Sequence, residues 1–532
     1  MRSLDALIIG AGFAGLYAIH LLRDRQGLDV VALEAASGVG GTWYWNRYPG
    51  ARCDSESWSY CFQFDDDLVR AWQWSERYPR QPEILRYLNH VADRFDLRRS
   101  IRLDTRVTAA RFDEAASRWL VTTEAGERYA ARFLITAVGC LSAANIPDIP
   151  GLEHFGGTWV HTGNWPEAGV DFTGKRVGLI GTGSTGIQAA PVIAAEAAHL
   201  TVFQRTPNYS VPAQNHPLDE TFRNRIKEAW PSLKARMRSN TNGHPYVPAD
   251  RGTFEVSDEQ RRAIYEQAWN AGGLSFRASF RDMMVDRAAN DEASAFIREK
   301  IRGIVKDPAT AAALTAFDHP FATKRPPIDT EYFETFNRDN VRLVDIRATP
   351  ITRIVAEGVE TRAGVVPLDI IVFATGFDAM TGPLLRIDIA GRGGTRLKDA
   401  WAEGPRTHLG LGVPGFPNLF TITGPGSPSV LTNMPVAIEQ HVDWIAGCIA
   451  WLRAEGLARI EATPDAADTW GAHVAEVANA TLYPTAASSW YLGANVPGKP
   501  RVFMPYLGGL GRYRAVCDTV AAEGYRGFTV AP

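Results

Sequence analysis

Cysteine is scarce in this chain of 532 residues, and the five that occur, at positions 53, 61, 140, 448 and 517, are scattered. No two of them form a Cys-x-x-Cys pair, which argues against a disulfide framework and against a disulfide reductase. An odd, unclustered set of thiols is typical of a reducing compartment, so we expect a cytoplasmic protein.

Excess positive charge is also lacking, since 56 Lys and Arg residues face 59 Asp and Glu residues, for a net charge of −3. Without a basic field, nucleic acid is not an expected partner. No apolar run reaches the roughly 18 residues of a membrane-spanning helix, and Asp5 before a glycine loop argues against a signal peptide. What remains is an ordinary globular composition, 45% hydrophobic and 22% charged, with room for about three or four domains.

A glycine-rich segment, Gly10-Ala-Gly12-Phe-Ala-Gly15, stands between a short apolar run and a predicted helix. Strand, tight turn and helix in this order bind a pyrophosphate, because the glycines let the backbone approach it and the helix N-terminus attracts it. The next apolar strand ends at Glu34, and an acid there accepts the hydroxyls of an unphosphorylated ribose. The site suits FAD or NAD and disfavours NADP.

A second segment, Gly181-Thr182-Gly183-Ser184-Thr185-Gly186, repeats this order. Arg205 follows Gly181 by 24 residues, the same interval that separates Gly10 from Glu34. A guanidinium at that place can grip a 2′-phosphate, and the hydroxyl of Thr206 stands beside it, although a solvated strand-end charge is the alternative. We therefore assign FAD to the first loop and NADPH to the second.

Two apolar strands that end at glycine, Phe133–Gly139 and Leu368–Gly376, resemble each other and indicate places where the chain passes between domains. The sequence predicts an α/β protein with two Rossmann-like dinucleotide-binding domains, the NADP domain inserted in the FAD domain. Helical periodicity dominates from about residue 208 to 318. We expect residues 1–143 and 378–532 to form the FAD-binding domain, and 144–377 the NADP-binding domain with its helical insertion.

A string between the two loops, Phe155-Gly-Gly-Thr-Trp-Val-His161-Thr-Gly-Asn-Trp165-Pro, is not required by a dinucleotide fold. On its own it could be a surface turn with a packed aromatic residue and a solvated histidine. Its pattern, F-x-G-x-x-x-H-x-x-x-W-P, resembles the signature of type I Baeyer–Villiger monooxygenases. A second string of that family, G-G-x-W followed by Y-P-G-x-x-x-D, is matched from Gly40 to Asp54.

This resemblance, which covers nearly the whole chain and is strongest to the phenylacetone monooxygenase branch, implies further site residues. The loop from Gly424 to Met434 would line a ketone pocket. Two departures from that branch are Ala14 inside the first loop and Cys140, and the second of these leaves the substrate open. The implied flavin-side residues are Thr42, Trp43, Asp54, Tyr60, Val107, Arg325 and Met434, and the NADP-side residues are Lys324 and Trp490.

The resemblance also implies the activity: NADPH and O2 convert a small-molecule ketone to an ester or lactone through a peroxyflavin. Arg325 and Asp54 are the expected catalytic residues, while His161 and Trp165 are expected to couple NADP binding to domain position. Sulfoxidation is an expected side activity, and no protein partner is implied. The alternatives are a flavin monooxygenase of amines or sulfides, which usually lacks the Trp-Pro end of the string, and an uncoupled NADPH oxidase.

Overall fold

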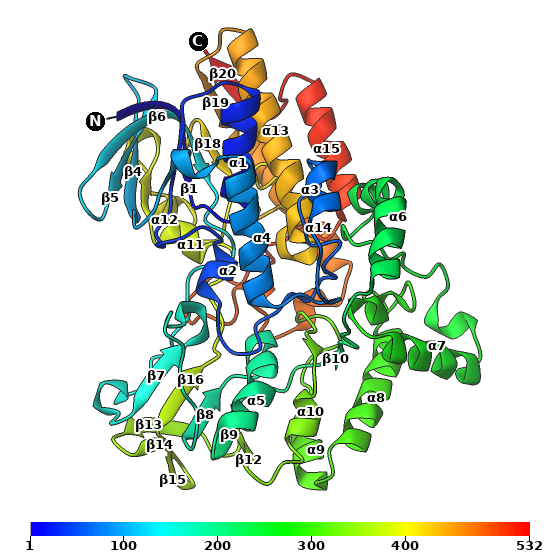
Figure 1. Ribbon diagram of the computed structural model, residues 1–532. Helices are drawn as coiled ribbons and strands as arrows, with labels where there is room; N and C mark the ends of the chain where they lie inside the picture. Colours follow the sequence, from blue (N-terminus) through cyan, green and yellow to red (C-terminus); the bar gives the residue numbers. More distant parts are fainter. Residues whose placement is uncertain (1) are drawn as a thin grey trace.

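A computed structural model describes residues 2–532, in which two β-sheets lie one above the other with helices around them (Figure 1). The upper sheet has the order β17-β4-β5-β6-β1-β2-β3, with β18 beside β6. Its central strands β1, β2 and β6 are parallel, whereas β4, β5 and β6 run antiparallel. Its strands are β1 (Arg2–Ile9), β2 (Val30–Leu33), β3 (Ile101–Arg102), β4 (Val107–Asp113), β5 (Arg118–Thr123), β6 (Arg128–Thr136), β17 (Asp388–Ala390) and β18 (Leu419–Thr421).

The lower sheet is parallel throughout, in the order β12-β9-β8-β16-β7. Its strands come from the stretch of chain that lies between β6 and β17, so the chain leaves the upper sheet, builds the lower one and returns. Both sheets and the parallel central strands confirm the predicted α/β class, while the boundaries at residues 143 and 377 stay a prediction. The strands are β7 (Thr158–His161), β8 (Arg176–Ile180), β9 (His199–Gln204), β12 (Val341–Asp345) and β16 (Ile370–Phe373).

Helices cover the upper sheet, and the long α13 (Met434–Ala454) lies beside α1 (Phe13–Ile19), which continues as a π-helix to Arg25 (Figure 1). The Tyr17 hydroxyl donates to the Asp443 carboxylate over 2.6 Å and joins these two helices. α13 begins after Asn433, and most of its side chains are buried. The other helices of this half are α2 (Thr42–Trp45), α3 (Asp66–Ala71), α4 (Gln81–Arg94), α11 (Gly382–Leu385), α12 (Leu397–Ala400), α14 (Pro464–Asn479) and α15 (Leu510–Ala522).

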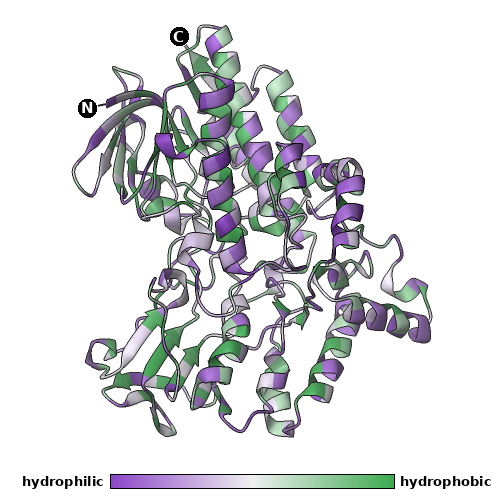
Figure 2. Ribbon diagram, viewed as in Figure 1, coloured by the Kyte–Doolittle hydropathy of each residue, from purple (hydrophilic) through white to green (hydrophobic). Residues whose placement is uncertain are grey.

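A group of helices follows β9 and stands at the side of the molecule (Figure 1). Each begins where an acidic or hydroxyl side chain accepts a hydrogen bond from a backbone N–H of its first turn, which stabilises a helix start by about 1 kcal/mol. Figure 2 shows that α6 and α7 are largely hydrophilic, whereas the strands of the lower sheet are largely hydrophobic. The four are α6 (Glu220–Ser239), α7 (Asp258–Ala271), α8 (Arg287–Ile304) and α9 (Pro308–Leu314).

The remaining elements connect or edge these layers. Within residues 2–532 no helix combines the length and apolarity that crossing a membrane would take. The same residues contain no cluster of side chains suited to hold a metal ion. The connecting elements are α5 (Ser184–Glu196), α10 (Tyr332–Thr335), β10 (Val211–Pro212), β11 (Ile328–Asp329), β13 (Ile351–Val355), β14 (Gly358–Thr361), β15 (Gly364–Pro367), β19 (Arg459–Ala462) and β20 (Phe528–Ala531).

Candidate active site

The first glycines of the two loops have the same conformation and the same neighbour. Gly10 has φ +107° and Gly181 has φ +116°, a region that favours glycine. A Cβ on Gly10 would lie 2.5 Å from the carbonyl oxygen of Ala137, and a Cβ on Gly181 would lie 2.4 Å from that of Ala374. Because Ala137 and Ala374 directly follow the two similar apolar strands β6 and β16, the repeat seen in the sequence is also a repeat in space.

The third glycines let each helix approach its own loop. A Cβ on Gly15 would lie 2.0 Å from the carbonyl oxygen of Gly10, and a Cβ on Gly186 would lie 2.1 Å from that of Gly181. No side chain caps the N-terminus of α1 or α5. Their first backbone N–H groups are therefore available to phosphate oxygens, so both loops fit a pyrophosphate.

The acid of the first loop is built into the fold. Glu34 is 5% exposed, and its carboxylate accepts hydrogen bonds from the N–H of Ala11 over 2.7 Å and of Ala36 over 2.9 Å. Burial raises the pKa of Glu34, and these N–H groups oppose that shift. Each carboxylate oxygen keeps a further acceptor position for a ribose hydroxyl, which fits FAD.

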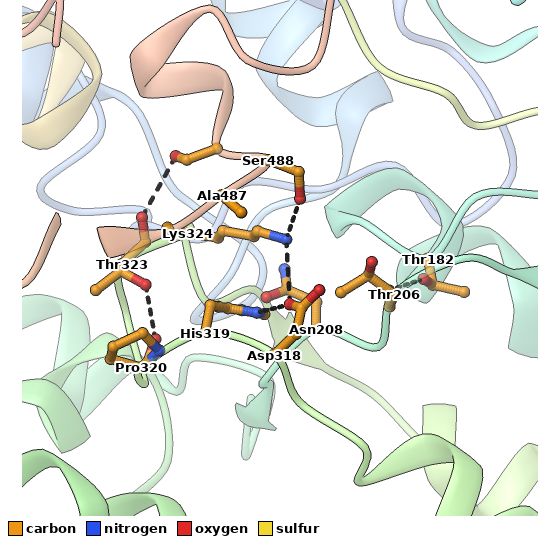
Figure 3. A network of polar contacts seen from close by, with 12 residues as sticks. Thr182, Thr206, Asn208, Asp318, His319, Pro320, Thr323, Lys324, Ala487 and Ser488 are labelled. Carbon is orange, nitrogen blue, oxygen red and sulfur yellow. Dashed lines mark hydrogen bonds and ion pairs between the residues drawn. The ribbon is translucent and has the colours of Figure 1, made fainter. Parts of the chain in front are cut away.

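The bases of the second loop gather at the end of β9. Arg205 is exposed there, and the Thr182 hydroxyl donates to the carbonyl of Thr206 over 2.8 Å (Figure 3). Lys324 reaches the same place, where its Nζ donates to the Ser488 hydroxyl over 2.8 Å. Burial lowers the pKa of Lys324, and the charge of Arg205 acts in the same direction. This cationic group fits a coenzyme with a 2′-phosphate.

A guanidinium and a carboxylate meet where the two halves of the molecule join. Arg325 Nε donates to Asp54 Oδ2 over 3.2 Å, and its Nη1 donates to the carbonyl of Val430 over 3.0 Å. The Gln188 side chain on α5 donates to Asp54 Oδ1 over 3.4 Å, so two residues of the second nucleotide unit hold a carboxylate of the first. Burial raises the pKa of Asp54, and Arg325 opposes that shift. Burial acts to lower the pKa of Arg325, but the neighbouring Asp54 carboxylate outweighs burial, so the pKa of Arg325 is raised.

The aromatic residues expected beside the flavin contact one another. Trp43 Nε1 donates to the Tyr60 hydroxyl over 3.2 Å, and the two rings meet edge to face. Thr42 is exposed at the start of α2, and Met434 is the first residue of α13. Val107 is buried at the start of β4, close to Thr105, whose N–H donates to the Glu34 carbonyl over 2.8 Å.

His161 ends β7, and only β16 separates it from the end of β8, where the second loop begins. His161 is 2% exposed, its Nδ1 accepts from the N–H of Gly163 over 2.9 Å, and its ring faces the edge of Phe377 in the returning chain. Because His161 is buried, the alternative of a solvated histidine is wrong. Burial also lowers the pKa of His161 to about 4. Trp165 is buried against Phe172 in the hydrophobic core that α5 and the lower sheet share. Their coupling role stays a prediction.

Trp490 and Cys140 belong to one hydrophobic cluster, which includes Tyr491. Trp490 is half-buried on a short 3₁₀ turn two residues after Ser488, and its ring centroid lies 4.3 Å from that of Tyr491, with the rings tilted by 45°. Cys140 is buried, and burial raises the pKa of its thiol to about 11, so the thiol is neutral near pH 7. Its effect on substrate choice stays a prediction.

Some polar residues of the site belong to no motif that the sequence analysis could identify. Gln188 holds Asp54, Ser488 holds Lys324, and Asp318 and Arg347 stand beside Lys324 and Thr206. Each is an ordinary polar residue in an unremarkable stretch. The only available signal is that Arg347 follows an apolar run that ends at Asp345, as Arg205 follows the run that ends at Gln204.

Comparison with known proteins agrees with this geometry. The family model of the pyridine nucleotide-disulphide oxidoreductases matches residues 7–294. The acetone monooxygenase (methyl acetate-forming) of Gordonia sp. (strain TY-5) is 47% identical over 532 residues, 99% of each chain. A Baeyer–Villiger monooxygenase of Pseudooceanicola batsensis is 44% identical over 98% of this chain and 95% of its own. A phenazine N-monooxygenase of Lysobacter antibioticus is also 44% identical, over 98% and 96%.

Solved structures extend the likeness to cofactor complexes. An oxidised steroid monooxygenase bound to NADP has a TM-score of 0.95 at 55% identity, with 100% of both chains covered. The structure named OTEMO in complex with FAD and NADP has a TM-score of 0.96 at 42% identity over 99% of each chain. The expected closeness to the phenylacetone monooxygenase branch stays a prediction.

The absence of a Cys-x-x-Cys pair separates this chain from the disulfide reductases that share its nucleotide-binding fold, and its five cysteines are all free thiols within residues 2–532. The likeness to the monooxygenases, by contrast, extends over nearly the full length. The chain belongs to the pyridine nucleotide-disulphide oxidoreductase family by its nucleotide-binding fold and, along its whole length, to the Baeyer–Villiger monooxygenases, which use FAD and NADP.

Proposed function

We propose that this enzyme, an FAD- and NADPH-dependent ketone monooxygenase, inserts one oxygen atom from O2 beside the carbonyl of its ketone and releases an ester or lactone. The observation that carries the proposal is the Arg325–Asp54 pair at the junction of the two nucleotide units. When bound, reduced FAD supplies the electrons that activate O2. The protein supplies the binding, the charge and the shelter from water.

Arg325 has one donor group to spare for an anion. Its Nε and Nη1 are engaged with Asp54 and Val430, while Nη2 has no hydrogen-bond partner within residues 2–532. A preorganised guanidinium can hold negative charge without reorganising during the reaction, and losing one such donor typically costs roughly 3 kcal/mol of transition-state stabilisation. Asp54 orients it, because a side chain with two fixed nitrogens has little freedom to turn.

The loop that carries Val430 would also shape the ketone pocket. Val430 belongs to the segment from Gly424 to Met434, so the same backbone fixes Arg325 and borders the expected substrate site. Relatives act, by their names, on acetone and on steroids, which differ greatly in size. Ketone size is therefore the first variable to survey.

N-oxidation is the second candidate, because a relative at 44% identity is named a phenazine N-monooxygenase. Sulfoxidation stays a prediction.

The five buried free cysteines support the proposal that the enzyme works in the reducing cytoplasm. A cytoplasmic flavoenzyme of this kind needs only its small-molecule substrate, O2 and coenzyme.

Product analysis decides between these functions. The FAD-loaded enzyme is incubated with NADPH, O2 and, in turn, acetone, cyclohexanone, a steroid ketone and phenazine. We expect ketone-stimulated NADPH consumption with about one ester or lactone formed per NADPH. N-oxide without any ester would favour the second candidate, and ketone-independent consumption with hydrogen peroxide would make the protein an oxidase.

A further inference from the structure

Arg347 follows β12 and lies beside the NADP-side strand end. β12 and β9 are parallel neighbours, with Asp345 opposite Gln204, and the N–H of Ile346 donates to the Gln204 carbonyl over 2.9 Å. Continuing this register by two residues places Arg347 beside Thr206. The contact is made, since Arg347 Nη2 donates to the Thr206 hydroxyl over 2.5 Å.

Three cations therefore meet at the carboxyl ends of β9 and β12, which is where ligands bind in parallel α/β sheets. Arg205 directly follows β9, Arg347 comes two residues after β12, and Lys324 comes from the loop before β11. The charges of Arg205 and Arg347 both act to lower the pKa of Lys324, after burial, which is the larger cause. The three side chains thus share one electrostatic site.

One carboxylate stands among them. Asp318 forms an ion pair with Arg347. It also lies 3.9 Å from Lys324 Nζ (Figure 3). Its other neighbour, His319, is buried with its pKa lowered to about 4, so it is neutral near pH 7 and does not offset the carboxylate. Three cations and one acid leave a surplus of two positive charges, and a phosphate monoester carries about −1.5 to −2 at pH 7.

We propose that Arg347 is a specificity residue for the 2′-phosphate of NADPH, and that Asp318 is the internal anion with which that phosphate competes for Arg347 and Lys324. This inference rests on the proposed assignment of NADPH to the second loop. Asp318 holds the cations close together while the coenzyme is absent. A 2′-phosphate with about two negative charges can compete with Asp318 for these cations, whereas the uncharged ribose of NADH cannot.

Binding of adenosine 2′,5′-bisphosphate and of 5′-AMP to the FAD-loaded enzyme, measured by calorimetry, tests this. Arg347→Ala removes a charge-assisted hydrogen bond, so we expect the bisphosphate to bind about tenfold or more weakly and 5′-AMP to change by less than about twofold. Arg347→Lys should restore part of the loss, because it keeps the charge. Asp318→Asn removes a like charge, and the bisphosphate should bind several-fold more tightly.

Arg342→Ala is the matched control, because Arg342 is exposed on the same strand and its loss removes the same charge. It should change neither affinity by more than about twofold. The Arg347 side chain is 43% exposed, and an unchanged melting temperature would show that Arg347→Ala folds.

The outcomes separate this inference from the assignment beneath it. Wild-type enzyme that binds both nucleotides equally would overturn the NADPH assignment itself. If the wild type prefers the bisphosphate and Arg205→Ala abolishes that preference while Arg347→Ala keeps it, only the role of Arg347 is wrong. Weaker bisphosphate binding by Asp318→Asn would contradict the competing role of that carboxylate.

Discussion

The two nucleotide loops share their glycine geometry but differ in what stands in front of them. A Cβ on Gly12, the middle glycine of the first loop, would lie 3.3 Å from the Cα of Gly41, whereas one on Gly183 would meet nothing within 4 Å. Glu34 is buried and tied to the backbone, whereas Arg205 is exposed. The first loop is closed by the chain itself and suits a cofactor that stays. The second is open and suits a coenzyme that comes and goes.

The difference in burial is what the proposed assignment of FAD to the first loop and NADPH to the second requires. A buried carboxylate is stabilised by fixed N–H donors and can present its oxygens to neutral hydroxyls. A 2′-phosphate arrives with its own charge from water, and cations that stay partly solvated cost less to keep unpaired. Under the proposed assignment, one loop geometry serves two cofactors because the residues after the next strand differ.

The largest effect is expected where the two units meet. Arg325→Ala removes the donor at the junction and with it roughly 3 kcal/mol of transition-state stabilisation. The rate of ester formation should therefore fall more than about a hundredfold, while NADPH oxidation continues. Ester yield and hydrogen peroxide are measured together by chromatography and a peroxidase assay. Arg325→Lys keeps a charge and serves as the control. A normal ester yield from Arg325→Ala would remove this residue from the mechanism.

Arg205→Ala should remove much of the preference for NADPH over NADH that we assign to the second loop. Loss of a charge-assisted hydrogen bond of about 1.5–3 kcal/mol predicts that the NADPH/NADH ratio of kcat/KM falls roughly ten- to hundredfold. Lys175→Ala is the control, because this exposed lysine precedes β8 at the opposite end of the sheet. The assignment of the second loop fails if Arg205→Ala leaves the ratio unchanged.

These loops could be predicted from the sequence because their information is local. Gly10 to Glu34 and Gly181 to Arg205 each lie within one strand–helix–strand unit. The pairing of Arg325 with Asp54 joins residues 271 apart, and only the family resemblance suggested it. Arg347 escaped prediction because its neighbour Thr206 is 141 residues away and is set by sheet register.

The string with His161 and Trp165 shows a different limit of sequence reasoning. Its spacing identified the family, but spacing alone does not distinguish a ligand from a core residue. The structure buries His161 against the returning chain at Phe377 and Trp165 against Phe172. Which side of a strand faces the core depends on packing partners from elsewhere in the chain.

Mild acid should weaken the contact at His161. Its folded-state pKa of about 4 lies below the ordinary 6.5, so the unfolded chain binds more protons between these values and stability falls as the pH drops from 6.5 towards 4. Between pH 7 and pH 5, the free energy of unfolding should fall by about 1 to 2 kcal/mol less in His161→Asn than in the wild type. Urea unfolding at both pH values measures this. Parallel losses in the two proteins would mean that His161 is protonated as easily in the folded state.

The smallest effects should come from the middle glycines. Gly183→Ala meets open space, so its stability should change by less than about 1 kcal/mol while the KM for NADPH rises, because this glycine lets the backbone approach the pyrophosphate. Gly12→Ala presses against Gly41 and should lower the melting temperature and the retained FAD. Equal melting temperatures for the two variants would contradict the contrast between a closed and an open loop.

Opposite ribose preference in two loops of equal shape is most directly tested by the nucleotide content and affinity of the purified wild-type protein. We expect a yellow protein with one FAD per chain, measured by absorbance, and one further site that binds adenosine 2′,5′-bisphosphate at least about tenfold more tightly than 5′-AMP. A colourless protein that takes up no flavin, or equal affinities for the two nucleotides, would contradict the account.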